Sequence, residues 1–184
     1  MLGSRYDDEV CSIARTLEVV GERWSLLILR NAVFAGTTRF GDFQRSLGIA
    51  SNVLAARLEA FVSAEVMERV PSDLRPASRE YRLTAKGRAL TPVLVALTDW
   101  GDAWAAPHGP PIVYRHARCG GVVTGATVCA GCGQVHDSSS VVATPGPAMS
   151  PERAERVAAR AAARLPVPEP GPASTDRSTR GDPS

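Results

Sequence analysis

Residues 40–61, FGDFQRSLGIASNVLAARLEAF, hold two short amphipathic segments separated by Gly48. In the second segment, apolar side chains recur at helical spacing along one face. These apolar residues are Val53, Leu54, Leu58 and Phe61. The other face starts with small or polar side chains, and Arg57 follows them. These small or polar residues are Ala50, Ser51, Asn52, Ala55 and Ala56. The pattern predicts a helix over 38–47, a turn at Gly48 and a second helix over 51–63.

A helix with a small and polar front end is suited to the DNA major groove, which is about 12 Å wide. Small side chains such as Ala55 let the helix backbone approach the bases. Ser51 and Asn52 can hydrogen-bond to base edges, and an asparagine can pair with adenine through two bonds. Arg57 lies one to two turns further on and can reach a guanine or a phosphate. An ordinary surface helix shows the same periodicity, so this alternative stays open here.

The neighbouring segments complete the pattern of a winged helix-turn-helix. Apolar periodicity predicts two further helices over 10–20 and 23–33. Residues 66–74 and 78–84 read as two strands around a loop, and Pro71 and Pro76 indicate an edge ribbon. The expected fold is therefore mainly α with a small β-ribbon, in the α+β class.

A long helix is expected over 85–104. Thr84 is a suitable N-cap for it, and Pro92 should kink it or split it. Apolar or small residues repeat along it at spacings of four and three, which suits packing against a partner helix. The members of this seam are Leu90, Leu94, Leu97, Gly101 and Trp104.

Four arginines outside the predicted recognition helix are candidates for contacts with the DNA backbone. Arg39 lies where the first helix of the pair begins, and Arg45 lies on the exposed face of that helix. Arg75 and Arg79 flank the tip of the ribbon, where an adjacent minor groove or phosphate would run.

The overall charge restricts how the chain can meet an anionic partner. The 184 residues carry a formal net charge of only +2, so DNA must be met by a local basic patch. The first residues are acidic where a secretory signal needs positive charge. No stretch approaches the ~20 apolar residues of a membrane span. We therefore expect a cytoplasmic protein without a membrane segment.

Five features occur together in order: Cys11, GERWSLLILR, RFGDFQRSLGI, VLAARLEAF and EYRLTAKGRAL. Through them, residues 11–107 resemble the HxlR family of winged helix-turn-helix transcription regulators. The resemblance implies a homodimer, built from the first and the last long helix, that binds a pseudo-palindromic operator. Ala50 stands where the family commonly has a serine cap, so the cap is expected to shift to Ser51. Glu65 replaces the usual acidic-Gly turn into the wing.

Cys11 is a candidate redox sensor because several HxlR-like regulators respond to oxidants or electrophiles through a cysteine at this position. Asp7, Asp8 and Glu9 would disfavour its thiolate, whereas Arg15 and the helix N-terminus would favour it. The alternative is a small buried apolar side chain.

A second group of cysteines lies beyond the predicted winged helix. His116-x2-Cys119 and Cys129-x2-Cys132 have the spacing of two zinc knuckles, and His136 is an alternative fourth ligand. A unit of this size builds little core, so a structural zinc ion would stabilise it. A thiol–disulfide switch at the second pair and plain packing are the alternatives.

The chain is thus predicted to consist of a lead (1–9), a winged helix-turn-helix domain (10–108), a zinc-ribbon-like module (112–142) and a disordered tail (143–184). The predicted function is a homodimeric DNA-binding regulator, a repressor that competes with RNA polymerase, and not an enzyme. The rival hypotheses are a thiol-disulfide oxidoreductase and a protein-interaction adaptor.

Overall fold

The computed structural model describes residues 11–72, 79–135 and 140–163. Arg75 and His136 lie outside these ranges. The elements of the first part are α1 (Ser12–Val20), α2 (Ser25–Phe34), α3 (Phe40–Leu47), α4 (Ser51–Ser63), β1 (Met67–Pro71), β2 (Arg79–Leu83), α5 (Ala85–Arg88) and α6 (Thr91–Trp104). Two-residue strands β3 (Val128–Cys129) and β4 (Gly133–Gln134) follow, and then α7 (Pro151–Ala162). The predicted helix-turn-helix and ribbon are therefore present.

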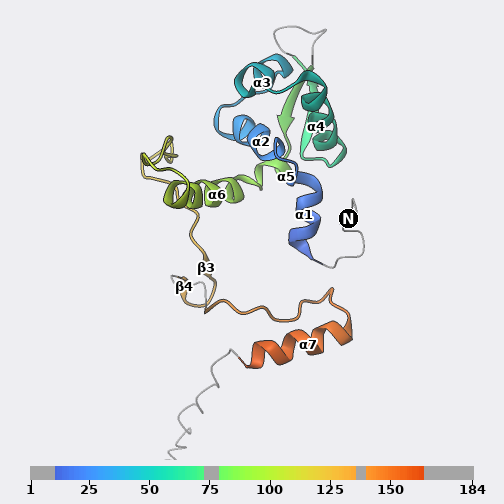
Figure 1. Cartoon of the computed structure of the whole chain (residues 1–184), viewed down its shortest axis with the longest axis vertical. Coiled ribbons are helices and arrows are strands. Elements are labelled where there is room, and N and C mark those ends of the chain that lie inside the picture. Colours follow the sequence, from blue (N-terminus) through green and yellow to red (C-terminus); the bar gives the residue numbers. More distant parts are fainter. Residues whose placement is uncertain (1–10, 73–78, 136–139, 164–184) are drawn as a thin grey trace, which may run out of the picture. The chain divides into compact units, whose positions relative to one another are not determined.

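The core lies where α2, α3 and α4 pack together beside the β1–β2 ribbon (Figure 1). Its fully buried side chains are aliphatic or aromatic, and they come from the apolar face of each helix. They include Ile28, Leu29, Phe43, Leu54, Leu58, Phe61, Val66 and Met67. Burial of these side chains provides the main stabilisation of the domain. The opposite face of α4 stays exposed as a result.

Helix α4 ends in a Schellman motif that leads into the ribbon. The N–H of Val66 donates to the carbonyl of Phe61, and the N–H of Glu65 donates to the carbonyl of Val62. Glu65 takes the left-handed position of this motif, with φ of +57°. Glycine usually occupies this position because it has no Cβ. The glutamate that replaces the family's turn glycine therefore adopts the turn conformation itself.

The ribbon pairs β1 and β2 in antiparallel register, from Met67 opposite Leu83 to Pro71 opposite Arg79. Thr84 ends the ribbon and caps α5, because its hydroxyl accepts the N–H of Gly87 at 3.1 Å. The predicted N-cap is thus confirmed. Gly87 packs so closely against the carbonyl of Val66 that an added Cβ would clash with it.

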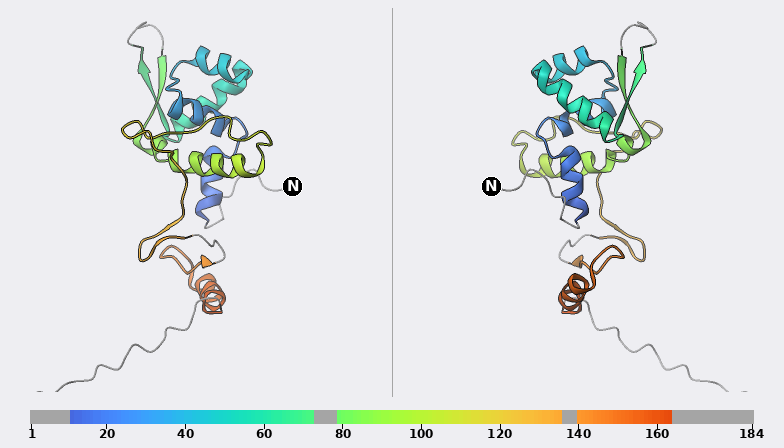
Figure 2. Two further views of the ribbon diagram at one scale, coloured as in Figure 1. Left: turned by 90° about the vertical axis from the view of Figure 1, so that its left-hand side faces the viewer. Right: turned by 90° about the vertical axis from the view of Figure 1, so that its right-hand side faces the viewer.

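The predicted split of the last long helix is also confirmed. Helices α5 and α6 are separate, and Pro92 lies in the first turn of α6, where a missing N–H is tolerated. Figure 2 shows α6 running below the group of helices that packs on the ribbon.

The predicted seam along α6 divides between different environments. Leu94 is buried in the core of its own chain and is therefore unavailable to a partner, and Leu90 is half-buried against that core. Leu97 and Trp104 remain exposed, at 47% and 78%, and Trp100 joins them. The expectation that the seam faces a partner helix was therefore wrong for Leu94.

A third face of α6 is covered by the segment that follows it. The N–H of Gly125 donates to Oδ2 of Asp99 at 2.6 Å. Gly125 also lies so near Ala96 that a Cβ added to it would clash with the helix. The residues after α6 thus pack along it rather than extending away.

By contact density the chain divides into two compact units, residues 1–136 and 137–184. In the second unit, the predicted disordered tail contains a 12-residue helix, α7. Pro151 lies in its first turn, and an ion pair joins Arg156 to Glu152 at 2.7 Å. None of the helices in the described ranges combines the length and apolar character that crossing a bilayer requires.

Candidate nucleic-acid interface

The turn between α3 and α4 sets the angle of the predicted recognition helix. Gly48 ends α3 in the left-handed conformation, with φ of +62° and ψ of +24°. Ile49 follows and is buried, so the turn is anchored in the core. The first residues of α4 after this turn, Ser51 and Asn52, are exposed.

The exposed front of α4 carries the residues predicted to contact bases. Ser51, Asn52 and Ala55 are exposed, while the neighbouring Leu54 is buried. Arg57 is half-buried. The structure therefore brings these four predicted side chains onto one helix with a buried back.

The start of α4 differs from the sequence-based expectation. Ala50 occupies the N-cap in an extended conformation, and no side chain caps the first turn. Ser51 is the first helical residue, so the predicted shift of the cap to Ser51 was wrong. The first backbone N–H groups of α4 therefore point outward without a side-chain acceptor, which suits an anionic oxygen.

Two of the predicted phosphate-binding arginines, Arg45 and Arg39, take part in ion pairs. Arg45 lies 3.1 Å from Asp42 on α3, and its side chain is 78% exposed. Arg39, the N-cap residue of α3, lies 3.3 Å from Oε1 of Glu80. Arg79 is exposed at the start of β2. Their roles in DNA contact stay predictions.

Glu80 is a buried carboxylate beside the candidate interface that the sequence reasoning missed. Its buried carboxylate accepts the Ser72 hydroxyl at 2.9 Å and the Arg82 guanidinium at 3.2 Å, besides the bond from Arg39. The hydrogen bond from Ser72 leads in holding the pKa of Glu80 below its ordinary value, against an opposing effect of burial. The available signal was an acidic residue at an inward-facing strand position, where an apolar one is typical.

A backbone hydrogen bond also joins the start of α3 to β2 of the ribbon, next to the bond between Arg39 and Glu80. The N–H of Tyr81 donates to the carbonyl of Thr38 at 2.8 Å, next to an isolated bridge between Arg39 and Glu80. These contacts join the wing to the start of α3.

Cys11 lies immediately before α1 as its N-cap residue and is half-buried. Its carbonyl accepts the N–H of Arg15 at 3.0 Å. It is a free thiol in this structure. Its redox role stays a prediction.

The second cysteine group forms two separate pairs. His116 Nδ1 lies 3.2 Å from Cys119 Sγ, in a tight turn closed by a backbone bond from Gly120 to His116. Cys129 and Cys132 lie at the turn between β3 and β4. Each pair lies at its own tight turn.

The thiols of the second pair differ in acidity. Backbone N–H groups of Cys132 and Gly131 lead in lowering the pKa of Cys129, and the Cys132 thiol adds to this. The hydrogen bond to Cys129 raises the pKa of Cys132. A thiolate on Cys129 that is bonded to its neighbour is what either metal binding or thiol exchange would use.

Sulfur and imidazole donors fit zinc in kind and in number. Within the described ranges, however, no three His, Cys, Asp or Glu side chains come together as a group that could hold a metal ion. The two pairs therefore do not form one centre here, and we derive no function from zinc. The zinc site stays a prediction.

Comparison with known proteins agrees with this geometry. Residues 19–109 match the model of the HxlR-like helix-turn-helix family. The chain is 44% identical over 147 residues to the uncharacterized HTH-type transcriptional regulator Rv3095 of Mycobacterium tuberculosis. These aligned residues make up 79% of this chain and 91% of Rv3095. The chain belongs to the HxlR-like helix-turn-helix family. It is thus a transcriptional regulator of the helix-turn-helix type, and the predicted family is confirmed.

Solved structures resemble this HxlR-like chain beyond the helix-turn-helix. The crystal structure of PA1607, a transcription-factor candidate, is 43% identical and covers 74% of this chain and 96% of its own, with a TM-score of 0.67. PA1374 of Pseudomonas aeruginosa is 39% identical, covers 79% of this chain and 99% of its own, and has a TM-score of 0.56. Since the family model matches only residues 19–109, these similarities include residues outside it.

Proposed function

We propose that this HxlR-like chain represses transcription by binding operator DNA as a homodimer, in the cytoplasm. The observation that carries the proposal is the front of α4, where Ser51, Asn52 and Ala55 are exposed over a fully buried Leu54. A helix of this kind can lie in the major groove without steric conflict. Asn52 and Arg57 then read base edges, and the wing lies along the backbone.

The proposed dimer rests on apolar side chains that no part of the described chain covers. Ile13 on α1 is 72% exposed and Trp100 on α6 is 64% exposed. Leu17 on α1 and Leu97 and Trp104 on α6 are exposed as well. Exposed apolar side chains gathered along two helices are candidates for an interface. A second copy of the chain is the natural occupant, because a two-fold axis presents two recognition helices to two half-sites.

Repression follows from simple competition for DNA. A dimer on an operator that overlaps a promoter excludes RNA polymerase. The arginines would provide salt-dependent affinity through phosphate contacts, while Asn52 and Arg57 would provide sequence preference.

The test is fluorescence anisotropy of the purified full chain with the intergenic DNA upstream of its own gene and a shuffled fragment, over a range of salt. We expect tight binding that prefers the native fragment and weakens steeply with salt. Asn52→Ala should weaken native binding about tenfold and reduce the preference over the shuffled fragment. Ser63→Ala, an exposed polar residue at the far end of the same helix, is the matched control and should bind as the wild type.

Two results would count against the proposal. One is equal weak binding to both fragments that Asn52→Ala leaves unchanged. The other is preferential DNA binding by a monomer, which would remove the homodimer while leaving DNA recognition intact.

A further inference from the structure

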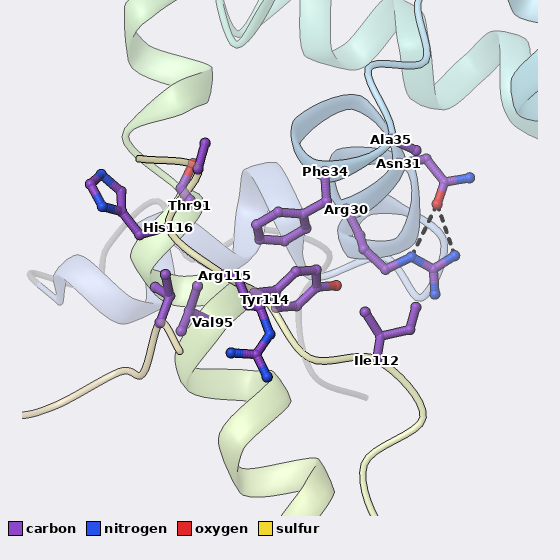
Figure 3. Close-up of a pocket in the computed structure, with 12 residues that line it drawn as sticks. Arg30, Asn31, Phe34, Ala35, Thr91, Val95, Ile112, Tyr114, Arg115 and His116 are labelled. Carbon is purple, nitrogen blue, oxygen red and sulfur yellow. Dashed lines mark hydrogen bonds between the residues drawn. The ribbon is translucent and has the colours of Figure 1, made fainter. Parts of the chain in front are cut away.

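A pocket of about 640 Å³ opens between α2, α6 and the segment that follows α6 (Figure 3). Arg30 and Phe34 come from α2, and Val95 comes from α6. Tyr114 and Arg115 come from residues 112–123, which lie beyond the 19–109 range of the family match. The volume is within the usual range for small-molecule sites. The helix-turn-helix alone does not build this pocket.

The pocket has an aromatic wall. The rings of Phe34 and Tyr114 stack with their centroids 3.8 Å apart and an angle of 22° between their planes. Ile112 and Val95 add aliphatic surface beside them. The ring of a ligand can make offset or edge-on contacts with these two rings. Such contacts favour a planar aromatic ligand over an aliphatic one.

The charges that line the pocket have one sign. Arg30 and Arg115 line it, and no aspartate or glutamate does so among the described residues. Arg30 donates from Nε and a terminal nitrogen to Oδ1 of Asn31, at 3.0 and 2.9 Å. Arg115 donates to the carbonyl of Gly120 at 2.8 Å. Within the described ranges both guanidinium groups are thus bonded to neutral oxygens, and their charges are not balanced by a carboxylate.

From this combination we infer that the pocket binds a small aromatic carboxylate, and that its occupancy controls α3. A carboxylate fits a guanidinium through paired hydrogen bonds, and the aromatic wall takes the ring that carries it. The apolar side chains around the pocket, of which Val95 is buried, strengthen the attraction between the charges where they exclude water.

The route from the pocket to the DNA-binding helices is a chain of side-chain hydrogen bonds. Asn31 is buried, accepts both bonds from Arg30 and donates from Nδ2 to Oγ of Ser46 on α3 at 2.9 Å. The Ser46 hydroxyl donates in turn to the carbonyl of Phe43, a core residue of α3. A carboxylate that takes the Arg30 donors leaves the Asn31 oxygen unpaired. The amide then turns to find a donor, and its bond to Ser46 is lost, which loosens α3.

This inference rests on the proposed function for its second half, because control of α3 matters only if the chain binds DNA. The binding half is tested without DNA. Isothermal titration of the full chain with 2-naphthoate should give saturable binding, and the neutral 2-naphthamide should bind at least about tenfold more weakly. Arg115→Gln should weaken 2-naphthoate binding by a similar factor. Arg118→Gln, an exposed arginine outside the pocket, is the matched control and should bind as the wild type.

The control half is tested with the native DNA fragment and saturating 2-naphthoate. We expect the affinity for DNA to fall at least about fivefold in the wild type. Ser46→Ala should keep 2-naphthoate binding but lose most of this effect, since its hydroxyl is the link to α3.

The results of these experiments test the carboxylate site, the control of α3 and the proposed function separately. Absence of saturable binding, or equal binding of the acid and the amide, would overturn the pocket's assignment as a carboxylate site. Binding that leaves DNA affinity unchanged would overturn the control of α3. A chain that does not bind DNA with or without 2-naphthoate would contradict the proposed function, while the titration would still decide the site.

Discussion

Arg39 Nε lies 3.3 Å from Oε1 of Glu80, and this pair joins the start of α3 to the second strand of the wing. The side chain of Glu80 is only 8% exposed, so its carboxylate depends on partners within the protein. The junction therefore fixes two surfaces that would contact DNA together.

Replacing Glu80 with glutamine should lower stability near neutral pH. The pKa of Glu80 is lowered in the folded state. The ionised carboxylate therefore contributes its full stabilisation of the fold at pH values above the unfolded-state pKa. This stabilisation is lost as the pH falls through the folded-state pKa. The urea midpoint of Glu80→Gln should thus lie below that of the wild type at about pH 7, and the gap should close under acidic conditions. A gap of constant size at every pH would contradict this explanation.

Replacing Glu65 with glycine should stabilise the domain. Glu65 has φ of +57°, a left-handed conformation that costs a non-glycine residue about 1–2 kcal/mol. Glycine removes that strain but loses more backbone entropy on folding, so a net gain of about 0.5–1 kcal/mol is expected. Glu65→Ala keeps the strain and is the control, which should show no gain in chemical denaturation. Equal stability of both variants would mean that the side chain, rather than the backbone, matters at this turn.

Replacing Gly87 with alanine should destabilise the chain by about 1–3 kcal/mol. The added Cβ would clash with the carbonyl of Val66, a backbone atom that is held between α4 and β1. Gly41→Ala on α3 is the control, because a Cβ there meets no atom within 4 Å. Denaturation midpoints should fall for the first variant and hold or rise for the second. If the Gly87→Ala variant had the same denaturation midpoint as the wild type, the ribbon would be able to shift away from α5.

Replacing Leu97 with glutamate should break the proposed dimer. Leu97 is 47% exposed on the open face of α6, and a charge at a closed apolar interface is strongly unfavourable. Sedimentation velocity should show a shift from dimer to monomer at micromolar concentration. Ala60→Glu adds the same charge on the exposed side of α4 and should stay dimeric. Dimers in both variants would place the interface elsewhere.

The zinc prediction requires the two cysteine pairs to act together. Protein prepared with zinc should then contain about one ion per chain, as a four-ligand site demands. Cys119→Ser and Cys132→Ser should both lose it, and Cys11→Ser should retain it, by elemental analysis. Retention of the full content in Cys119→Ser would show that the pairs do not share an ion.

The helices and the ribbon could be predicted because their signals are local. Apolar periodicity, Gly48 and the Thr84 cap each act within a few residues of themselves. The bond from Arg39 to Glu80 joins residues far apart in the chain, and no local pattern shows that they meet. The seam of α6 failed for the same reason, since spacing alone does not distinguish Leu94, which faces its own core, from Leu97, which is exposed.

The three faces of α6 have a consequence for how its length can change. Leu94 packs in the core, Asp99 receives the segment that follows the helix, and Leu97 is exposed. Each residue turns an α-helix by about 100°, so one inserted or deleted position would move every later side chain onto the wrong face. Natural variation in this helix should therefore consist of substitutions, while gains and losses of residues gather in the loops on either side.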